Sequence, residues 1–152
     1  MRVLLQRVRK ASVHVEGETV GRIGAGLLVL LGVESGDAAE DADYMADKTA
    51  LLRIFRDEQG RMNRSVEETS GAILVVSQFT LAATTRKGRR PSYNRAAPPE
   101  IAEPLYRRFV DRLRSRGLAV ESGVFQAMME VESINDGPVT ILLDPAPDRG
   151  AD

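Results

Sequence analysis

Residues 72–81 read AILVVSQFTL, and this stretch carries the strongest fold signal in the chain. Its first half, Ile73–Val76, is continuous, apolar and rich in β-branched residues, which predicts a strand buried on both faces. Ser77, Gln78 and Thr80 then follow with no break in the strand pattern. Buried hydrogen-bonding side chains are costly when they are unpaired. Either neighbouring backbone groups or a ligand must satisfy these three side chains, and the pattern alone leaves both interpretations open.

Alternating and apolar segments elsewhere predict further strands. We expect them at residues 1–9, 12–16, 19–23, 27–33, 53–56, 124–134 and 139–143. A first helix is predicted from Asp37, as its cap, to about Leu52. A second helix is predicted to begin at residues 98–100 and to end at Gly117. Its apolar residues recur every four positions, at Ile101, Leu105, Phe109 and Leu113. Many strands with two main helices predict an α+β fold, in which mostly antiparallel sheets curl into a barrel-like core.

Length and composition indicate one domain. The chain has 152 residues, 43% of them hydrophobic, which is enough for a single core. We expect residues 1–145 to form that domain and residues 146–152 to form a disordered C-terminal tail. Two arginines within the first seven residues argue against a signal peptide, and no apolar run approaches the roughly 18 residues of a membrane span. We therefore expect a cytoplasmic protein with no membrane contact.

The residue types that are missing exclude several chemistries. The sequence contains no cysteine, which rules out disulfides, thiolate catalysis and thiolate metal ligands. Its one histidine, His14, alternates with Val13 and Val15, so we expect the imidazole to face solvent and to take no part in catalysis. The sequence predicts neither a metal site nor a cofactor.

A second polar motif, Asn135-Asp136-Gly137-Pro138, has strong turn chemistry. A plain loop between two strands is one interpretation. The other is a rigid element that presents backbone carbonyls to a ligand, because the proline ring is stiff and lacks an N–H group. The sequence does not decide whether the Gly137–Pro138 bond is cis or trans.

Positive charge concentrates in the segment RKGRRPSYNR at residues 86–95, which contains no acid and one aromatic residue, Tyr93. A flexible basic loop beside a polar strand end suits a phosphate-bearing substrate. The arginines at residues 107–116 have acidic neighbours and indicate a solvated helix face. Because the net charge is −1, we expect any such binding to be local.

Two motifs resemble the signatures of D-aminoacyl-tRNA deacylases, also called D-tyrosyl-tRNA deacylases. They are Ser77-Gln78-Phe79-Thr80-Leu81 and Asn135-Asp136-Gly137-Pro138-Val139-Thr140. Residues 5–8, 11–13, 26–33, 53–55 and 90–92 also fit the family pattern. The resemblance runs from Met1 to about Asp144, which is essentially the whole predicted domain.

The resemblance implies a homodimer with active sites at the subunit interface. The reaction would be hydrolysis of the ester between a D-amino acid and the terminal adenosine of tRNA. Four residues would line the catalytic pocket: Ser77, Gln78, Phe79 and Thr80. Gly137 and Pro138 would form a cis-proline motif that enters the other subunit's pocket and excludes L-amino acids.

Further roles follow from the same resemblance. Met129 would line the pocket, and Arg7 would support the proline loop. The residues expected to bind tRNA are Arg86, Lys87, Arg89 and Arg90. Gln126 departs from the family pattern, which usually has a small residue at that position.

Several alternatives remain open at the level of sequence. Thr80 is either a nucleophile or a bystander in hydrolysis assisted by the RNA itself. If exclusion is purely steric, glycyl-tRNA should also be cleaved, because glycine has no side chain to exclude. A non-catalytic tRNA-binding module and a hydrolase of small esters are the competing functions.

Overall fold

The computed structural model describes residues 1–146, and most of the predicted tail therefore lies outside the described residues. Its elements in chain order are β1 (Arg2–Val15), β2 (Glu18–Ile23), β3 (Gly26–Gly32), α1 (Ala39–Leu51), β4 (Phe55–Arg56), β5 (Met62–Arg64), β6 (Ala72–Ser77), a 3₁₀ turn (Phe79–Ala82), α2 (Pro99–Ser115), β7 (Ala119–Ser122) and β8 (Glu130–Leu142). Within residues 1–146, no helix is long and apolar enough to cross a membrane.

Strand β1 organises the sheet, because it pairs with three other strands. Residues 2–8 pair with β3, residues 11–15 pair with β2, and β8 runs along the other edge, all antiparallel. Strands β3, β6 and β7 are mutually parallel. The sheet curls far enough for β2 to contact β6 and β7. The α+β class and the barrel-like curl are thus confirmed, with a mixed sheet.

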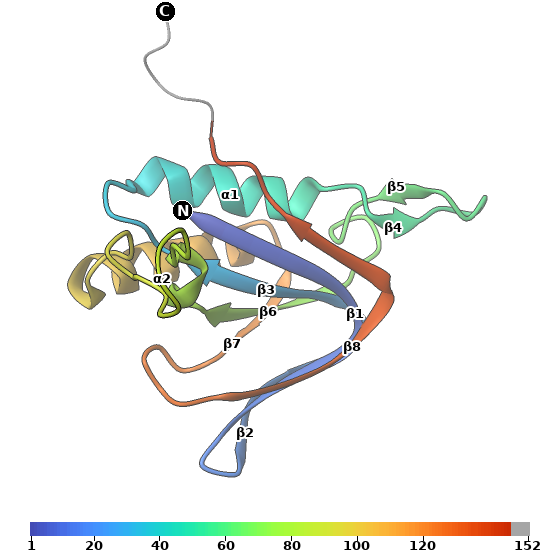
Figure 1. Ribbon diagram of the computed structural model, residues 1–152. Coiled ribbons are helices and arrows are strands. Elements are labelled where there is room, and N and C mark those ends of the chain that lie inside the picture. Colours follow the sequence, from blue (N-terminus) through green and yellow to red (C-terminus); the bar gives the residue numbers. More distant parts are fainter. Residues whose placement is uncertain (147–152) are drawn as a thin grey trace, which may run out of the picture.

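Two apolar clusters occupy opposite faces of the sheet, and the alternation of side chains sorts residues between them. Val29, Leu31, Ile73 and Val75 belong to the cluster that also contains the helices. Leu28, Leu74 and Val76 belong to the second cluster, inside the curl. Figure 1 shows α1 and α2 on one side of the strands, away from β2. The prediction that residues 73–76 are buried on both faces is confirmed.

Helix α1 begins differently from the prediction. Its N-cap is Ala38, and the Ala38 N–H donates to Asp41 Oδ2 at 2.7 Å. Asp37 instead accepts hydrogen bonds from the Glu34 N–H and from the N-terminal ammonium of Met1. The carboxylate predicted to cap the helix therefore anchors the beginning of the chain.

Helix α2 has the predicted position but a different buried face. The residues that it buries are Ala102, Tyr106, Phe109, Val110 and Leu113. Ile101 is 48% exposed. A spacing of four residues overshoots the helical repeat of 3.6, so an every-fourth stripe rotates off the core within a few turns.

A ladder of ion pairs joins the two helices. Arg108 donates two hydrogen bonds to Asp43, and Arg112 donates two to Asp47, at 2.7–2.9 Å. Hydrogen bonds from these guanidinium groups lower the pKa of both carboxyls. Arg116 extends the ladder to Asp47 and Glu67. The arginines of α2 that face α1 are thus paired with carboxylates across the contact between the helices.

The segment between α2 and β8 corrects the predicted strand at residues 124–134. Strand β7 precedes it, at Ala119–Ser122, and was not predicted because its four residues are partly polar and form no apolar run. Residues 123–129 form a loop with a turn at Phe125–Gln126, where Gln126 has φ of 65°. The alternating apolar residues of this loop line a pocket instead of one face of a sheet.

Candidate active site

The polar motif after β6 leaves the sheet sooner than predicted. The strand ends at Ser77, and Phe79–Ala82 form the 3₁₀ turn. The Gln78 N–H still donates to the Leu31 carbonyl at 2.8 Å, which ties the turn to β3. A side chain at Gly32 would place its Cβ 2.8 Å from the Gln78 carbonyl oxygen. Glycine at this position lets the turn pack directly on the end of β3.

The turn sets the surroundings of the Thr80 hydroxyl. The Gln78 side-chain amide donates to Thr80 Oγ1. The imidazole of His14 bonds to Ser12 and Thr19 on the β1–β2 hairpin, with His14 Nε2 also 3.6 Å from Glu132. Within residues 1–146, the hydrogen bonds bring no imidazole or carboxylate to Thr80. A threonine hydroxyl without such a base is a weak nucleophile.

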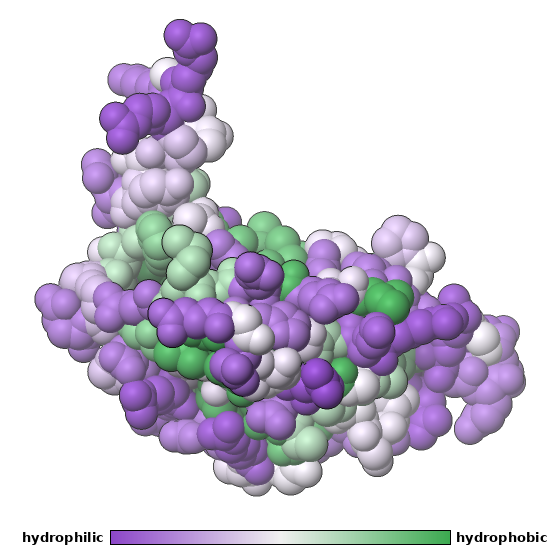
Figure 2. Space-filling view, turned by 90° about the horizontal axis from the view of Figure 1, so that it is seen from below, coloured by the Kyte–Doolittle hydropathy of each residue, from purple (hydrophilic) through white to green (hydrophobic). Residues whose placement is uncertain are grey.

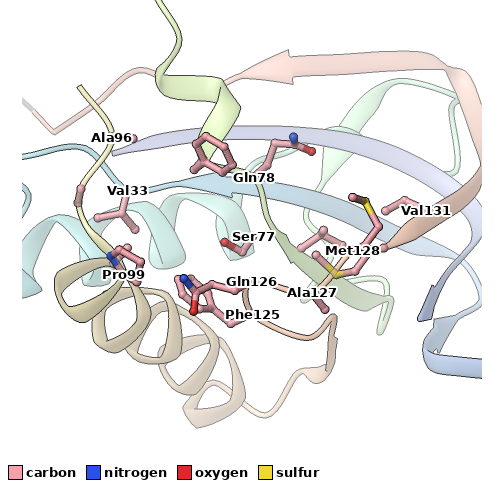
Figure 3. A pocket seen from close by; sticks show the side chains of 15 residues that line it. Val33, Ser77, Gln78, Ala96, Pro99, Phe125, Gln126, Ala127, Met128 and Val131 are labelled. Carbon is pink, nitrogen blue, oxygen red and sulfur yellow. The ribbon is translucent and has the colours of Figure 1, made fainter. Parts of the chain in front are cut away.

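A pocket of about 630 Å³ opens beside this turn. Ser77, Gln78 and Phe79 line it, and Thr80 does not. The remaining wall is mostly apolar and comes from the β3 end, the start of α2 and the 125–131 segment: Val33, Val76, Ala96, Ala97, Pro99, Ala102, Phe125, Gln126, Ala127, Met128, Met129 and Val131. Figure 3 shows Ser77 and Gln126 within the same hollow, with Gln126 near Pro99. The size and apolar lining are typical of a small-molecule site with a few orienting polar groups.

The 123–129 loop is shaped to place Met129 in this pocket. A Cβ at Gly123 would lie 2.7 Å from the Met129 sulfur, so glycine makes room for that side chain. Met129 also packs on the apolar cluster inside the curl. Gln126 is exposed at the pocket wall, and no hydrogen bond among the described residues engages its side chain.

The predicted proline loop is a bulge in β8. Pairing with β1 passes from Val8–Asn135 directly to Gln6–Thr140, so residues 136–139 leave the ladder. Asn135 closes the bulge, because its amide accepts from the Val139 N–H at 2.8 Å and donates to the Val139 carbonyl at 3.2 Å. The Gly137–Pro138 bond is cis. Gly137 has φ of 152°, and a Cβ there would lie 2.7 Å from the Val139 nitrogen, so the position requires glycine.

The side chain of Arg7 fixes this bulge through hydrogen bonds. Its side chain is almost fully buried, and its Nε donates to the Asp136 carbonyl at 2.9 Å. Its Nη1 donates to the Ile54 carbonyl at 2.7 Å, and the Asp136 carboxylate lies 3.4 Å from Nε. A buried cation with carbonyl and carboxylate partners fixes the bulge relative to β1.

The pocket and the proline loop of one chain lie far apart. Ser77 pairs with Leu31, and Leu31 pairs with Val3 near the start of β1. The proline loop lies opposite Arg7, on the other edge of β1. From Ser77 to the proline loop, three strand spacings of ~4.8 Å are crossed, from β6 through β3 and β1 to β8. The path also runs four residues of ~3.3 Å along β1, at right angles to those spacings. The separation measured along the sheet is therefore roughly 20 Å. Neither Gly137 nor Pro138 lines the pocket.

The predicted tRNA-binding cations occupy an exposed loop beyond the 3₁₀ turn. Arg86, Lys87, Arg89 and Arg90 are all exposed. In the described part of the chain, no ion pair engages them, in contrast to the paired arginines of α2. The sequence analysis noted Tyr93 only as the one aromatic residue of the basic segment, and it did not predict that residues 96, 97 and 99 line the pocket. The contact between Tyr93 and Phe79 could not be read from positions 14 residues apart.

Comparisons with known proteins define the class first. A solved structure described as "c-Myc DNA Unwinding Element Binding Protein" matches with a TM-score of 0.90 and 41% identity, over 97% of this chain and all of that one. A second, described as a probable eukaryotic D-amino acid tRNA deacylase, matches with a TM-score of 0.81 over 93% of this chain and 97% of that one. At 22% identity, the second match speaks for the fold alone. The two matches thus define the structural class, an α+β fold that the chain shares with both proteins.

The family follows from the sequence matches. The model of the D-Tyr-tRNA(Tyr) deacylase family matches residues 4–144. The D-aminoacyl-tRNA deacylase of Symbiobacterium thermophilum is 61% identical over 144 residues, 95% of either chain. That of Syntrophotalea carbinolica is 60% identical, over 95% of this chain and 97% of its own. The chain belongs to the D-Tyr-tRNA(Tyr) deacylase family.

Replacing Arg7 with methionine should loosen the proline loop. The change keeps an apolar stem but removes the donors to the Asp136 and Ile54 carbonyls, so we expect the free energy of unfolding to fall by about 1–3 kcal/mol. Amide exchange at Val139 should also accelerate. Urea denaturation and hydrogen exchange followed by NMR measure the two effects.

The matched control for this substitution is Arg9→Met. Arg9 is 76% exposed and its Nε lies 4.0 Å from the Asp136 carboxylate. Because exposed ion pairs contribute little to stability, the free energy of unfolding of this variant should differ from that of the parent by less than about 1 kcal/mol. Unchanged exchange at Val139 in Arg7→Met would show that Arg7 does not hold the loop.

Proposed function

We propose that this chain hydrolyses the ester bond of D-aminoacyl-tRNA and releases the free D-amino acid and tRNA. The observation that carries the proposal is the largely apolar pocket at the end of β6, with exposed cations on the adjoining loop. Its volume of about 630 Å³ suits an adenosine with an attached amino acid. The named function of the 61%-identical relative, a D-aminoacyl-tRNA deacylase, supports the same assignment.

The chemistry asks little of protein side chains. Water attacks the ester carbonyl carbon, the bond from that carbon to the ribose oxygen breaks, and the leaving ribose oxygen takes up a proton from the attacking water to become a free hydroxyl. The N–H group of Phe79, a residue that lines the pocket, precedes the first hydrogen bond of the 3₁₀ turn, from the Leu81 N–H to the Gln78 carbonyl. Unpaired N–H groups at the start of such a turn are suited to stabilise a developing oxyanion.

The group that assists this proton transfer is the ribose hydroxyl next to the ester, which gives its proton to the leaving ribose oxygen as it accepts one from the attacking water; Thr80 takes no part. Two observations support this assignment. Thr80 Oγ1 accepts a hydrogen bond from the Gln78 side chain, and the imidazole of His14 is hydrogen-bonded on the β1–β2 hairpin and not to Thr80. A hydroxyl that already accepts from an amide is less available as a nucleophile.

Chiral selection in this proposal comes from the proline loop of a second copy of the chain. The carbonyls of Gly137 and Pro138 accept hydrogen bonds from the substrate α-ammonium, and the loop then collides with an L side chain while a D side chain points away. The exposed position of both residues and the clamps from Arg7 and Asn135 support this role. A rigid obstacle discriminates by excluding the wrong substrate.

A homodimer would bring the two elements together. The separation of roughly 20 Å along the sheet argues that a chain does not close its own pocket. Strand β8 leaves Ile134 47% and Leu142 53% exposed, and these are apolar side chains that another copy could cover. Figure 2 shows apolar patches open to solvent among polar residues on one face of the molecule. We place the reaction in the cytoplasm, where aminoacyl-tRNA is used.

Substrate stereochemistry tests the proposal. Purified protein should release tyrosine from D-tyrosyl-tRNA and spare L-tyrosyl-tRNA, with at least about a 100-fold difference in rate if steric exclusion contributes about 3 kcal/mol. Glycyl-tRNA should be cleaved as well. A deacylation time course on the three substrates measures all of this.

Three outcomes would contradict parts of the account. Protection of glycyl-tRNA would refute selection by steric exclusion alone. Tight binding of tRNA without cleavage of any D-ester would favour a tRNA-binding module. Equal turnover of small esters that lack RNA would favour a general esterase, which leaves the basic loop without a role.

The role of Thr80 is tested by truncating its hydroxyl. Thr80→Ala should keep turnover of D-tyrosyl-tRNA within about tenfold of the parent, since the substitution removes only an orienting hydrogen bond of about 1 kcal/mol. Removing the ribose hydroxyl beside the ester should instead slow single turnover by about 100-fold or more. Near-complete loss of turnover in Thr80→Ala, with Thr80→Ser active, would make Thr80 the nucleophile.

A further inference from the structure

Two aromatic side chains meet at the pocket mouth, and both are exposed. Phe79 lines the pocket and is 56% exposed, and Tyr93 is 40% exposed. Their ring centroids lie 5.2 Å apart at an interplanar angle of 68°, an edge-on arrangement. Phe79 and Tyr93 form what we call the aromatic step. Large apolar groups left open to solvent at a binding site are typical of contact surfaces.

The backbone fixes the position of Tyr93. Immediately before it, Thr84 and Ser92 exchange two backbone hydrogen bonds of 2.9 and 3.0 Å. Immediately after it, the Ala96 N–H donates to the Tyr93 carbonyl at 3.0 Å, and Arg95 pairs with Glu34 at 2.9 Å. These backbone hydrogen bonds and the ion pair fix the base of the loop, so the Tyr93 ring has a defined position although it is exposed.

Positively charged side chains lie farther from the pocket than the aromatic step. Arg86, Lys87, Arg89 and Arg90 occupy the tip of the same loop, beyond the Thr84–Ser92 bridge. The order from the inside is thus pocket, aromatic step, cationic tip. Surfaces that bind single-stranded nucleic acid combine aromatic faces for the bases with cations that follow the backbone.

We propose that the aromatic step stacks the unpaired nucleotides just upstream of the terminal adenosine, so that Tyr93 is a substrate-binding residue for the single-stranded end of tRNA. This inference rests on the proposed function and adds a residue outside the pocket. A protein partner fits the surface less well, because its rim is cationic and contains no acid from Arg86 to Arg95. Stacking tolerates any base, as a surface shared by all tRNAs requires.

The experiment compares two esters of the same D-amino acid. D-tyrosyl-tRNA contains the upstream nucleotides, and D-tyrosyl-adenosine lacks them. In Tyr93→Ala, kcat/KM for the tRNA ester should fall by about 5- to 100-fold, mainly through KM, because one stacked base is lost. Turnover of the adenosine ester should stay within about twofold, and Tyr93→Phe should retain most activity on both esters.

A binding measurement accompanies the kinetics and does not depend on hydrolysis. Uncharged tRNA should bind Tyr93→Ala about 5- to 100-fold more weakly than it binds the parent, in fluorescence anisotropy at fixed salt. The matched control is Tyr44→Ala, on helix α1, which should not change either readout.

Each result decides between distinct readings. An equal fall for both esters would make Tyr93 a positioning residue for Phe79 and overturn the stacking proposal. Unchanged kinetics and binding in Tyr93→Ala would also overturn it. If the parent cleaves neither ester, the proposed function fails, while a selective loss of tRNA binding in Tyr93→Ala would still support the stacking surface.

Discussion

The buried guanidinium of Arg7 is the interaction on which the arrangement of the site depends. It joins the Ile54 carbonyl, after α1, to the Asp136 carbonyl at the proline loop. Arg7 lies on β1, whose register with β3 also places β6 and therefore the end of that strand at Ser77. One strand thus sets the positions of both functional elements. A buried guanidinium that donates to backbone carbonyls tolerates little displacement. If it moved, both the buried charge and the carbonyl oxygens would lose their hydrogen-bond partners.

That register also keeps the two elements apart. The pocket of one chain contains the polar residues after β6, the apolar wall residues and the aromatic side chain of Phe79. The proline loop of the same chain lies on the other edge of β1 and does not line this pocket. In the function that we propose, the pocket holds the nucleoside and supplies an N–H group, and the loop of a second copy selects the amino acid. That proposal assigns catalysis and stereochemical selection to different subunits, so that each element can remain rigid.

The fold and the two motifs were accessible from the sequence because they depend on local patterns. Residues 73–76 form a strand, and the chain leaves the ladder directly after Asn135, as their side-chain chemistry indicates. The 3₁₀ turn after Ser77 was missed, because it depends on the close approach permitted by Gly32. The pocket wall at 123–129 was taken for a strand, since alternating residues fit both. The aromatic step and the helix ladder join residues distant in sequence and required the tertiary structure.

Subunit complementation tests the central claim, that the site combines a pocket and a loop from two copies. One chain would contain Arg7→Met, which disables the loop, and the other Ala127→Trp, which fills the pocket. Heterodimers isolated with two different affinity tags contain one intact pocket facing one intact loop, so they should cleave D-tyrosyl-tRNA at about half of the wild-type rate and still spare L-tyrosyl-tRNA, whereas the Arg7→Met homodimer should cleave both esters and the Ala127→Trp homodimer neither. Heterodimers that cleave L-tyrosyl-tRNA as readily as the Arg7→Met homodimer would show that pocket and loop act within a single chain, and would contradict the account.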